Sequence, residues 1–398
     1  MTISKPLLVL LTLGFALAGN VQRIDARTRS EAQQQYTENL WTYITSGSNH
    51  YTTWRLASTP VEFDFGPPSD ATSKSYLNNQ AASTPTLTHN SVVVTEHRSA
   101  NQGSLAAVTV FVKSAPGFNA HTDDWYWAHY LPNGIAIDSS SDQRVFGKRG
   151  FVTFPVEGRL WIFRSNSELL SDFVANGELA KHVIRPGMGP AGMTLKAPDT
   201  ETLSEYICKK NGFITKIVDG RVWVFRAASP ELENFLADGT LAKHVIRPGV
   251  GPNGMTVKSP DMITVDAYLT AKDGFTTKVV DGRLWVFRQD APELAAFNRD
   301  GELAKHVIRP GAGPLGMTLK APDDGTILEY LTVQTGFFTQ IVDGRLWVFK
   351  LGSDELAEFQ SIGEPAKYVI RPTAGPLGMT LKGPDSNTID TYLRFAVQ

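Results

Sequence analysis

The chain has 398 residues, of which 42% are hydrophobic and 20% are charged, as in ordinary globular proteins with room for two or more domains. Its formal net charge of −2 gives no overall attraction to nucleic acid or to an anionic membrane. We therefore expect no nucleic-acid partner, and any binding of a polyanion has to come from a local basic surface.

The first residues have the pattern of a secretory signal peptide. Lys5 precedes an apolar run from Pro6 to Ala18, and the small residues Ala16 and Ala18 fit a cleavage site. The run is short for a membrane span, and an N-terminal anchor is the alternative. We predict that residues 1–18 are removed, that the protein is exported to the periplasm or the extracellular space, and that no membrane span remains.

Residues 19–149 form a unit that differs from the rest of the chain. Tyr36, Leu40 and Ile44 are spaced as on one face of a helix, which predicts a helix over 28–45. Strand-like runs follow at 91–96, 105–113 and 125–130. Their β-branched and aromatic residues favour an antiparallel sheet.

Three elements of this unit resemble the cytochrome P460 domain family. They are Tyr-x-Asn-x-x-Ala at 76–81, Asn-Ser-x-x-Val-x-Glu at 90–96 and Asp-Trp-x-Trp-x-x-Tyr-x-Pro-x-Gly at 124–134. The resemblance implies a domain that, in the family, carries a c-type haem on Cys-x-x-Cys-His and a lysine cross-linked to the haem. Here no cysteine follows Gly134 within the unit, and Thr95 stands where the family usually has the lysine of Val-Lys-Glu. Since covalent attachment needs those thiols, we predict a haem-less relative.

From Gly150 onward the chain repeats every 62 residues without insertion or deletion. Such a period indicates an array of supersecondary units stacked on their neighbours. The period leaves open whether the array is extended or closes into a ring. The copies span 150–211, 212–273, 274–335 and 336–398.

Each copy has the pattern ββαββα. In the second copy, Asp219-Gly220 predicts a two-residue hairpin turn between two strands. Ser229 and Pro230 predict the start of a first helix, and Asp261 predicts the start of a second. The expected fold class is α+β, with an antiparallel β-rich P460-like domain followed by four tandem ββαββα repeats.

A tryptophan recurs in the second strand of every hairpin. The turn places Lys216 opposite Trp223 and Lys278 opposite Trp285, so a cation–π contact from this strand is possible in only two copies. We interpret the tryptophans as core residues, with ligand stacking as the alternative. They are Trp161, Trp223, Trp285 and Trp347.

Cys208 is the only cysteine, so the chain has no internal disulfide. The equivalent positions hold Thr270, Thr332 and Arg394. This variation predicts an exposed helix end, and we expect no catalytic thiol there.

Histidine and methionine recur at one spacing, which suits copper in an exported protein. However, Tyr368 replaces the histidine in the fourth copy and no second histidine or cysteine completes a site, so we favour packing within strands. We expect no cofactor; copper here, or non-covalent haem in the P460-like domain, is the alternative. The candidate ligands are His182, Met193, His244, Met255, His306 and Met317.

A lysine–arginine pair also recurs in every copy and is the candidate binding surface. By the two-residue period of a strand, Lys243 and Arg247 flank Val245 on one face. Four such faces would bind an acidic glycan or an unknown partner protein through several contacts. Alternatively, nearby acids such as Asp219 and Asp261 pair with these charges. The candidates are Lys181, Arg185, Lys243, Arg247, Lys305, Arg309, Lys367 and Arg371, and the positions of Arg159 and Lys196 recur as well.

No Ser-His-Asp order, paired carboxylates or metal-ligand cluster with hydrolase spacing is found, so we expect no enzymatic activity. The sequence predicts an exported, non-enzymatic repeat protein that acts as a binding or structural array. A periplasmic redox or metal-binding protein is the alternative.

Overall fold

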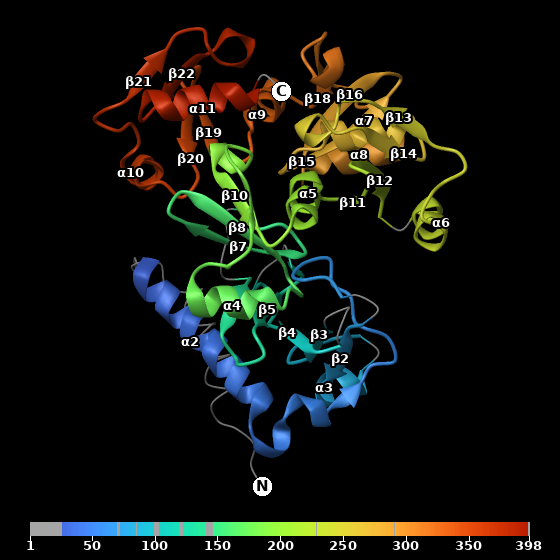
Figure 1. Ribbon diagram of the computed structural model, residues 1–398. Coiled ribbons are helices and arrows are strands. Elements are labelled where there is room, and N and C mark those ends of the chain that lie inside the picture. The colour runs from blue at the N-terminus through green and yellow to red at the C-terminus, as the bar shows by residue number, and fades with distance from the viewer. Residues whose placement is uncertain are drawn as a thin grey trace. The chain divides into compact units, whose positions relative to one another are not determined.

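The computed structural model describes residues 26–398 apart from 70–71, 85, 99–102, 119–121, 141–145, 228, 290 and 397–398, with the side chains of 26–33 and 396 also excluded. The predicted signal peptide lies outside the described residues. The chain divides into two compact units (Figure 1). One ends at Phe154 and also contains Trp161–His182, and the other contains Pro155–Leu160 and Val183–Gln398.

The described part of the first unit contains a helix and an antiparallel sheet, as predicted. Helix α2 spans Ala26–Thr45, and the three predicted strands are β3, β4 and β5. The sheet follows the chain in the order β1-β2-β3-β4-β5-β6. The bounds are η1 Gly47–Asn49, η2 Tyr51–Thr53, β1 Arg55–Leu56, β2 Lys74–Leu77, α3 Asn79–Ser83, β3 Val92–Arg98, β4 Leu105–Lys113, β5 Trp125–Tyr130 and β6 Ala136–Ser139.

Helix α2 packs its apolar face on this sheet. Leu40 and Ile44 are buried in one cluster with Val94 and Val110. The hydroxyl of Tyr130 on β5 donates a 2.7 Å hydrogen bond to the carbonyl of Thr37 on the helix. The apolar residues whose spacing predicts the helix therefore also pack it on the sheet.

The first repeat contributes to the core of the first unit. Trp161 and Phe173 are buried in one cluster with Leu131 and Ile137, which precede the repeats in sequence. The compact units therefore divide the chain within the first repeat, whereas the sequence period starts at Gly150. The elements of this repeat are β7 Phe151–Val156, β8 Arg159–Arg164, α4 Leu169–Asn176, β9 Val183–Arg185, η4 Pro190–Gly192, β10 Thr194–Ala197 and α5 Thr200–Cys208.

The second repeat shows the arrangement that the later copies share. Its sheet has the order β11-β12-β14-β13, in which β12 and β14 are parallel and the other neighbours are antiparallel. This mixed sheet with two helices confirms the ββαββα pattern, with a short 3₁₀ turn between the last two strands. The bounds are β11 Phe213–Val218, β12 Arg221–Arg226, α6 Pro230–Asp238, β13 Val245–Arg247, η5 Pro252–Gly254, β14 Val257–Ser259 and α7 Met262–Thr270.

The third and fourth repeats have the corresponding sheet orders β15-β16-β18-β17 and β19-β20-β22-β21. The third contains β15 Phe275–Val280, β16 Arg283–Arg288, α8 Pro292–Asp300, β17 Val307–Arg309, η6 Pro314–Gly316, β18 Thr318–Ala321 and α9 Asp324–Thr332. The fourth contains β19 Phe337–Val342, β20 Arg345–Lys350, α10 Asp354–Ile362, β21 Val369–Arg371, η7 Pro376–Gly378, β22 Thr380–Gly383 and α11 Ser386–Ala396.

The hairpin turn has the predicted geometry. Asp219 and Gly220 have φ angles of 50° and 70°, the positive values that a two-residue hairpin turn of this type requires. The turn sets the register, so Lys216 pairs with Trp223 as predicted. Because side chains alternate along a strand, Trp223 then lies on one face of the sheet and Val222 and Val224 lie on the other.

The two faces of the sheet pack on different helices. Trp223 and Phe225 form a cluster with Phe235 of α6, whereas Val222 and Val224 pack with residues of α7. The second helix begins as predicted, because the carboxylate of Asp261 accepts a 2.7 Å hydrogen bond from the Thr264 N–H. A repeat therefore has one core on each side of its sheet.

Neighbouring repeats are joined through their second helices. The Tyr268 hydroxyl donates a 2.8 Å hydrogen bond to the carbonyl of Cys208, the last residue of the preceding second helix. The ammonium group of Lys210 in turn donates to the carbonyls of Tyr268 and Ala271, at 2.8 and 3.2 Å. The tyrosine bond recurs from Tyr330 to Thr270 and from Tyr392 to Thr332.

The prediction of an exposed helix end at Cys208 is wrong. Cys208 and Thr270 are fully buried, and Thr332 is 2% exposed. They are buried because the following repeat packs on them. Arg394, at the equivalent position of the fourth repeat, is exposed.

The array also folds back so that its first repeat contacts its fourth. The Ala191 N–H donates a 3.3 Å hydrogen bond to the carbonyl of Thr335, at the end of the third copy, and helix α11 packs on turn η4. At Gly336, φ is +89° and a Cβ atom would lie 2.4 Å from the Ala191 nitrogen. Only glycine fits this junction, and the array is not an extended line of repeats.

Candidate binding sites on the repeats

The recurring lysine–arginine pair lies at the edge strand of each repeat. The arginines Arg185, Arg247, Arg309 and Arg371 end strands β9, β13, β17 and β21, and all four are exposed. The lysines Lys181, Lys243, Lys305 and Lys367 are also exposed. The isoleucine in the middle of each edge strand is 45–50% exposed: Ile184, Ile246, Ile308 and Ile370.

The prediction that Lys243 and Arg247 lie on one face of the same strand is wrong. Strand β13 begins at Val245, and Lys243 lies in a bend before it. The two-residue alternation of a strand therefore does not place Lys243 on the face of Arg247. The same holds in the other copies, since each lysine precedes a strand of three residues.

The four arginines differ in their acidic partners. Arg309 forms an ion pair of 2.8 Å with Asp324, and Arg371 forms one of 3.4 Å with Asp390. Both partners lie on the second helix of the same repeat, not at the predicted positions of Asp219 and Asp261. Among the described residues, Arg185 and Arg247 have no ion pair with a carboxylate; Arg185 donates to the carbonyl of Ile184 at 3.3 Å.

The histidines and methionines of the proposed copper ligands lie in different cores. His244 lies beside Trp223, with ring centroids 4.8 Å apart, on the α6 side of the sheet. Met255 packs on the α7 side with Val222 and Val257. His306 and Met317 are separated in the same way, and Tyr368 takes the histidine's place beside Trp347. In the first copy His182 lies 4.9 Å from Trp161, and Met193 is half-buried.

Metal ligands do not gather elsewhere in the described part of the chain. No group of three or more histidine, cysteine, aspartate or glutamate residues is placed to hold an ion there. The histidine ring is instead fixed by the backbone, since Nδ1 of His244 lies 3.0 Å from the carbonyl of Leu241. That nitrogen carries the proton, because a carbonyl can only accept.

A tryptophan and a lysine lie close together in the second, third and fourth repeats. The tryptophans are only 2% exposed, which supports their interpretation as core residues. The ammonium group of Lys258 lies 4.7 Å from the centre of the Trp223 ring, and Lys320 and Lys382 lie 4.6 and 4.7 Å from Trp285 and Trp347. Such distances allow cation–π attraction.

The predicted cation–π partner is therefore the wrong lysine. Lys216 faces Trp223 in the hairpin, but the ammonium group over the ring belongs to Lys258, on the parallel neighbour β14. The contact recurs in the third and fourth repeats, although Gln340 stands in the hairpin position of the fourth. The recurrence of a lysine at this position is a signal for it, but the sequence does not show that β14 pairs with β12.

A glutamate covers this lysine in the third and fourth repeats. The ammonium groups of Lys320 and Lys382 donate to Glu302 and Glu364 at 2.8 and 2.6 Å. These two lysine side chains are only 8% and 5% exposed. In the second repeat the equivalent of the glutamate is Thr240.

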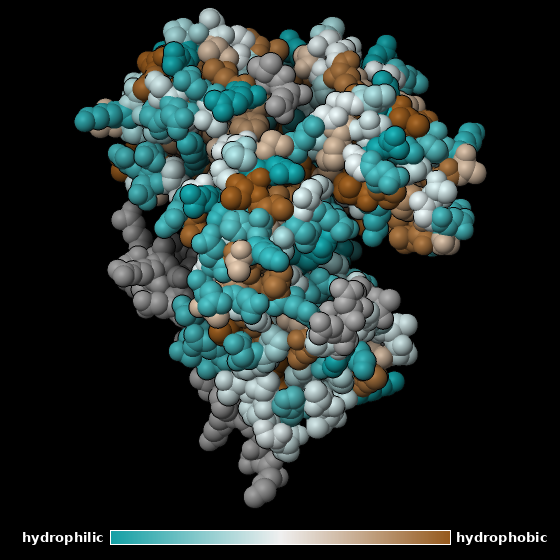
Figure 2. Space-filling model, viewed as in Figure 1, coloured by the Kyte–Doolittle hydropathy of each residue, from teal (hydrophilic) through white to brown (hydrophobic). Residues whose placement is uncertain are grey.

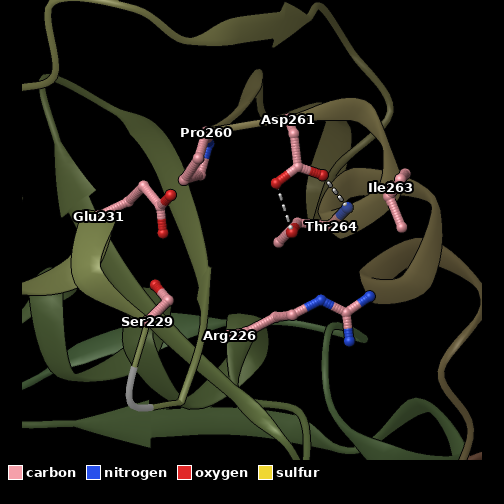
Figure 3. Close-up of a pocket in the computed structure, with 7 residues that line it drawn as sticks. All are labelled: Arg226, Ser229, Glu231, Pro260, Asp261, Ile263 and Thr264. Atoms are coloured by element: carbon pink, nitrogen blue, oxygen red, sulfur yellow. Dashed lines mark hydrogen bonds between the residues drawn. The ribbon is translucent and has the colours of Figure 1, made fainter.

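A small pocket in the second repeat lies between the end of β12 and the starts of α6 and α7 (Figure 3). Asp261 uses both carboxylate oxygens on Thr264, as the dashed lines show. The Arg226 guanidinium has no ion pair among the described residues. In the third repeat the equivalent Arg288 is paired with Glu329 at 2.7 Å and Asp323 at 3.4 Å. The pocket is thus formed by helix-capping groups, which have a structural role of their own.

A buried polar chain in the first unit is not predicted by the sequence reasoning. His97 Nε2 and His129 Nδ1 each lie 2.7 Å from the Thr109 hydroxyl, and His129 Nε2 lies 2.9 Å from the carbonyl of Ser165. Because a carbonyl only accepts, His129 Nε2 carries a proton, Thr109 donates to His129, and His97 donates to Thr109. The chain fixes the tautomers of both histidines and satisfies groups that are fully buried.

Figure 2 shows mostly hydrophilic residues on the displayed face, with hydrophobic residues in small separate patches. None of the described helices combines the length and apolar character needed to cross a bilayer.

Comparison of the chain with protein-family models, with curated proteins and with solved structures finds no match. The resemblance of the N-terminal unit to cytochrome P460 domains stays a prediction.

Proposed function

We propose that this is an exported, non-enzymatic binding protein whose repeats present basic residues to an anionic partner. One observation carries the proposal: an exposed lysine and an exposed arginine lie at the edge strand of all four repeats. Repetition of the same charged pair lets one acidic polymer make several contacts at once, which raises its avidity.

The arginines of the first two repeats are the most available. Arg185 and Arg247 have no ion pair with a carboxylate among the described residues. A ligand's acidic group can therefore approach them without displacing a side chain of the protein.

The arginines of the other two repeats are held only weakly by acids. The side chains of the Arg309–Asp324 pair are 49% and 53% exposed, and those of the Arg371–Asp390 pair are 45% and 57% exposed. Exposed ion pairs contribute about 0–1 kcal/mol. A polyanion can replace Asp324 or Asp390 at little cost in free energy.

Charge reversal tests this function. Replacing Arg185, Arg247, Arg309 and Arg371 together by glutamate should abolish retention on a polyanion column, and retention of the wild type should fall as salt rises. The matched control replaces the same four residues by lysine, which keeps the charges and should keep most of the retention. If both variants elute like the wild type while remaining folded, the edge strands are not the binding surface.

Removing the acidic partners of Arg309 and Arg371 should change retention on the polyanion column in the opposite direction. Replacing Asp324 and Asp390 by asparagine frees two arginines without adding a positive group to the surface, so retention should increase. Unchanged retention would contradict a role for the third and fourth repeats. A Soret band or stoichiometric copper in the purified protein would favour the redox alternative over this proposal.

A further inference from the structure

The third and fourth repeats show what the lysine over the tryptophan binds. In each, a glutamate just after the first helix places one carboxylate oxygen on the ammonium group, at 2.8 Å for Glu302 and 2.6 Å for Glu364. The lysine lies over the tryptophan ring and is almost fully buried beneath this glutamate. The third and fourth repeats are thus examples of a glutamate bound in this position.

Other basic and polar groups surround the bound carboxylate. Lys320, and after it His306 and Arg283, hold the pKa of the Glu302 carboxyl below its usual value. In the fourth repeat, Lys382 does the same for Glu364, and the Tyr368 hydroxyl donates a hydrogen bond to it.

The second repeat has the binding groups without the glutamate. Its residues at the three equivalent positions are Lys258, His244 and Arg221. Lys258 keeps its place over Trp223, at 4.7 Å, and His244 lies beside the same ring. The glutamate position is Thr240, which is exposed, and among the described residues Lys258 has no carboxylate partner.

An ammonium group beside a tryptophan face has lost part of its water, and a carboxylate restores the lost interaction more fully than the ring does. Threonine is shorter than glutamate and carries no charge. The position that a carboxylate fills in the third and fourth repeats is thus open in the second repeat.

We propose that the second repeat binds a glutamate side chain of an acidic polypeptide at Lys258, in the position that Glu302 and Glu364 fill in the later repeats. This inference rests on the proposed binding of an anionic partner and names that partner. A polypeptide is favoured over an acidic glycan because Glu302 and Glu364, which fill the position in the third and fourth repeats, are glutamate side chains.

The test uses the chain from residue 19 onward and a short glutamate-rich peptide, with binding measured by calorimetry. Thr240→Glu supplies the second repeat with its own carboxylate, so it should weaken peptide binding at least tenfold without loss of thermal stability. Lys258→Gln should weaken binding to the same extent. If Thr240→Glu is folded and binds the peptide like the wild type, the inference is overturned.

The reverse change tests the same position. Glu302→Thr opens the third repeat, so the stoichiometry should rise from one peptide to two. The matched control is Glu293→Thr, which removes a glutamate at the start of α8 and should leave the stoichiometry at one. Binding of a uronate oligosaccharide at Lys258, with no binding of the peptide, would overturn the choice of partner.

The outcomes separate this inference from the proposed function. Loss of polyanion retention in the four-arginine variant, together with no peptide binding by the wild type, would support the array and reject the glutamate site. Peptide binding that Thr240→Glu abolishes, together with full retention of the four-arginine variant, would support the glutamate site and reject the edge-strand surface.

Discussion

In the second to fourth repeats, the two faces of the sheet differ in how they complete their cores. On the first-helix face, Trp285 packs with Phe287 and Phe297 of its own repeat. On the second-helix face, Tyr330 packs in its own repeat but bonds to the carbonyl of Thr270 in the preceding one. One face is therefore closed within a repeat, and the other holds the repeats together.

This difference explains which positions change between copies. The tryptophan is the same in all four copies, and in the second to fourth repeats the residues of its buried cluster come from its own repeat. The position of Cys208, Thr270 and Thr332 does change between copies although these three residues are buried, and Arg394 at the same position of the fourth copy is exposed. Variation among copies can thus mark a contact between repeats as well as an exposed site.

The largest expected effect comes from placing a charge between repeats. Thr270→Arg puts a long charged side chain at a position that is fully buried and should cost more than about 5 kcal/mol. Chemical denaturation monitored by circular dichroism measures the loss. Arg394→Thr, the matched change at the exposed copy, should alter stability by less than about 0.5 kcal/mol. Equal effects of the two variants would contradict the comparison.

A smaller loss is expected on the face that closes within a repeat. Trp285→Ala removes a ring that is 2% exposed and should cost ~3–5 kcal/mol. Because Phe287 and Phe297 belong to the same repeat, hydrogen exchange should increase mainly in residues 274–335. Increased exchange spread evenly over all repeats would show that this core is not local.

The smallest effect concerns the lysine that joins the second repeat to the third, and it depends on pH. Lys272 donates to the carbonyl of Tyr330 at 2.9 Å, and burial lowers its pKa from 10.5 to about 8. Since the unfolded chain then binds more protons between these pH values, stability should rise as the pH increases from about 8 to 10.5. Lys272→Gln, which introduces the residue that the next copy has at Gln334, should lack this rise of up to about 3 kcal/mol. Parallel pH profiles of the two proteins would contradict the prediction.

Contacts between residues that are close in sequence can be predicted from the sequence. Asp219-Gly220 sets the hairpin register through its turn geometry, and Asp261 starts its helix through a hydrogen bond three residues away. The sequence assigns the wrong lysine to Trp223, because β14 reaches β12 only after an intervening helix and strand. The open position at Thr240 follows from the same contact and could not be recognised without it.

The contact between Ala191 and Thr335 has a consequence for the order of assembly. Each hairpin can form as soon as it has been synthesised, and each second helix can dock on the next repeat when that repeat is complete. Closure onto η4 must wait until Thr335 and helix α11 have left the ribosome, because these residues supply the other side of the contact. A contact between residues so distant in sequence forms slowly, because a long loop must close first. Until then Ala191 remains uncovered, so the nascent chain offers this surface to other molecules for longer than any contact between adjacent repeats.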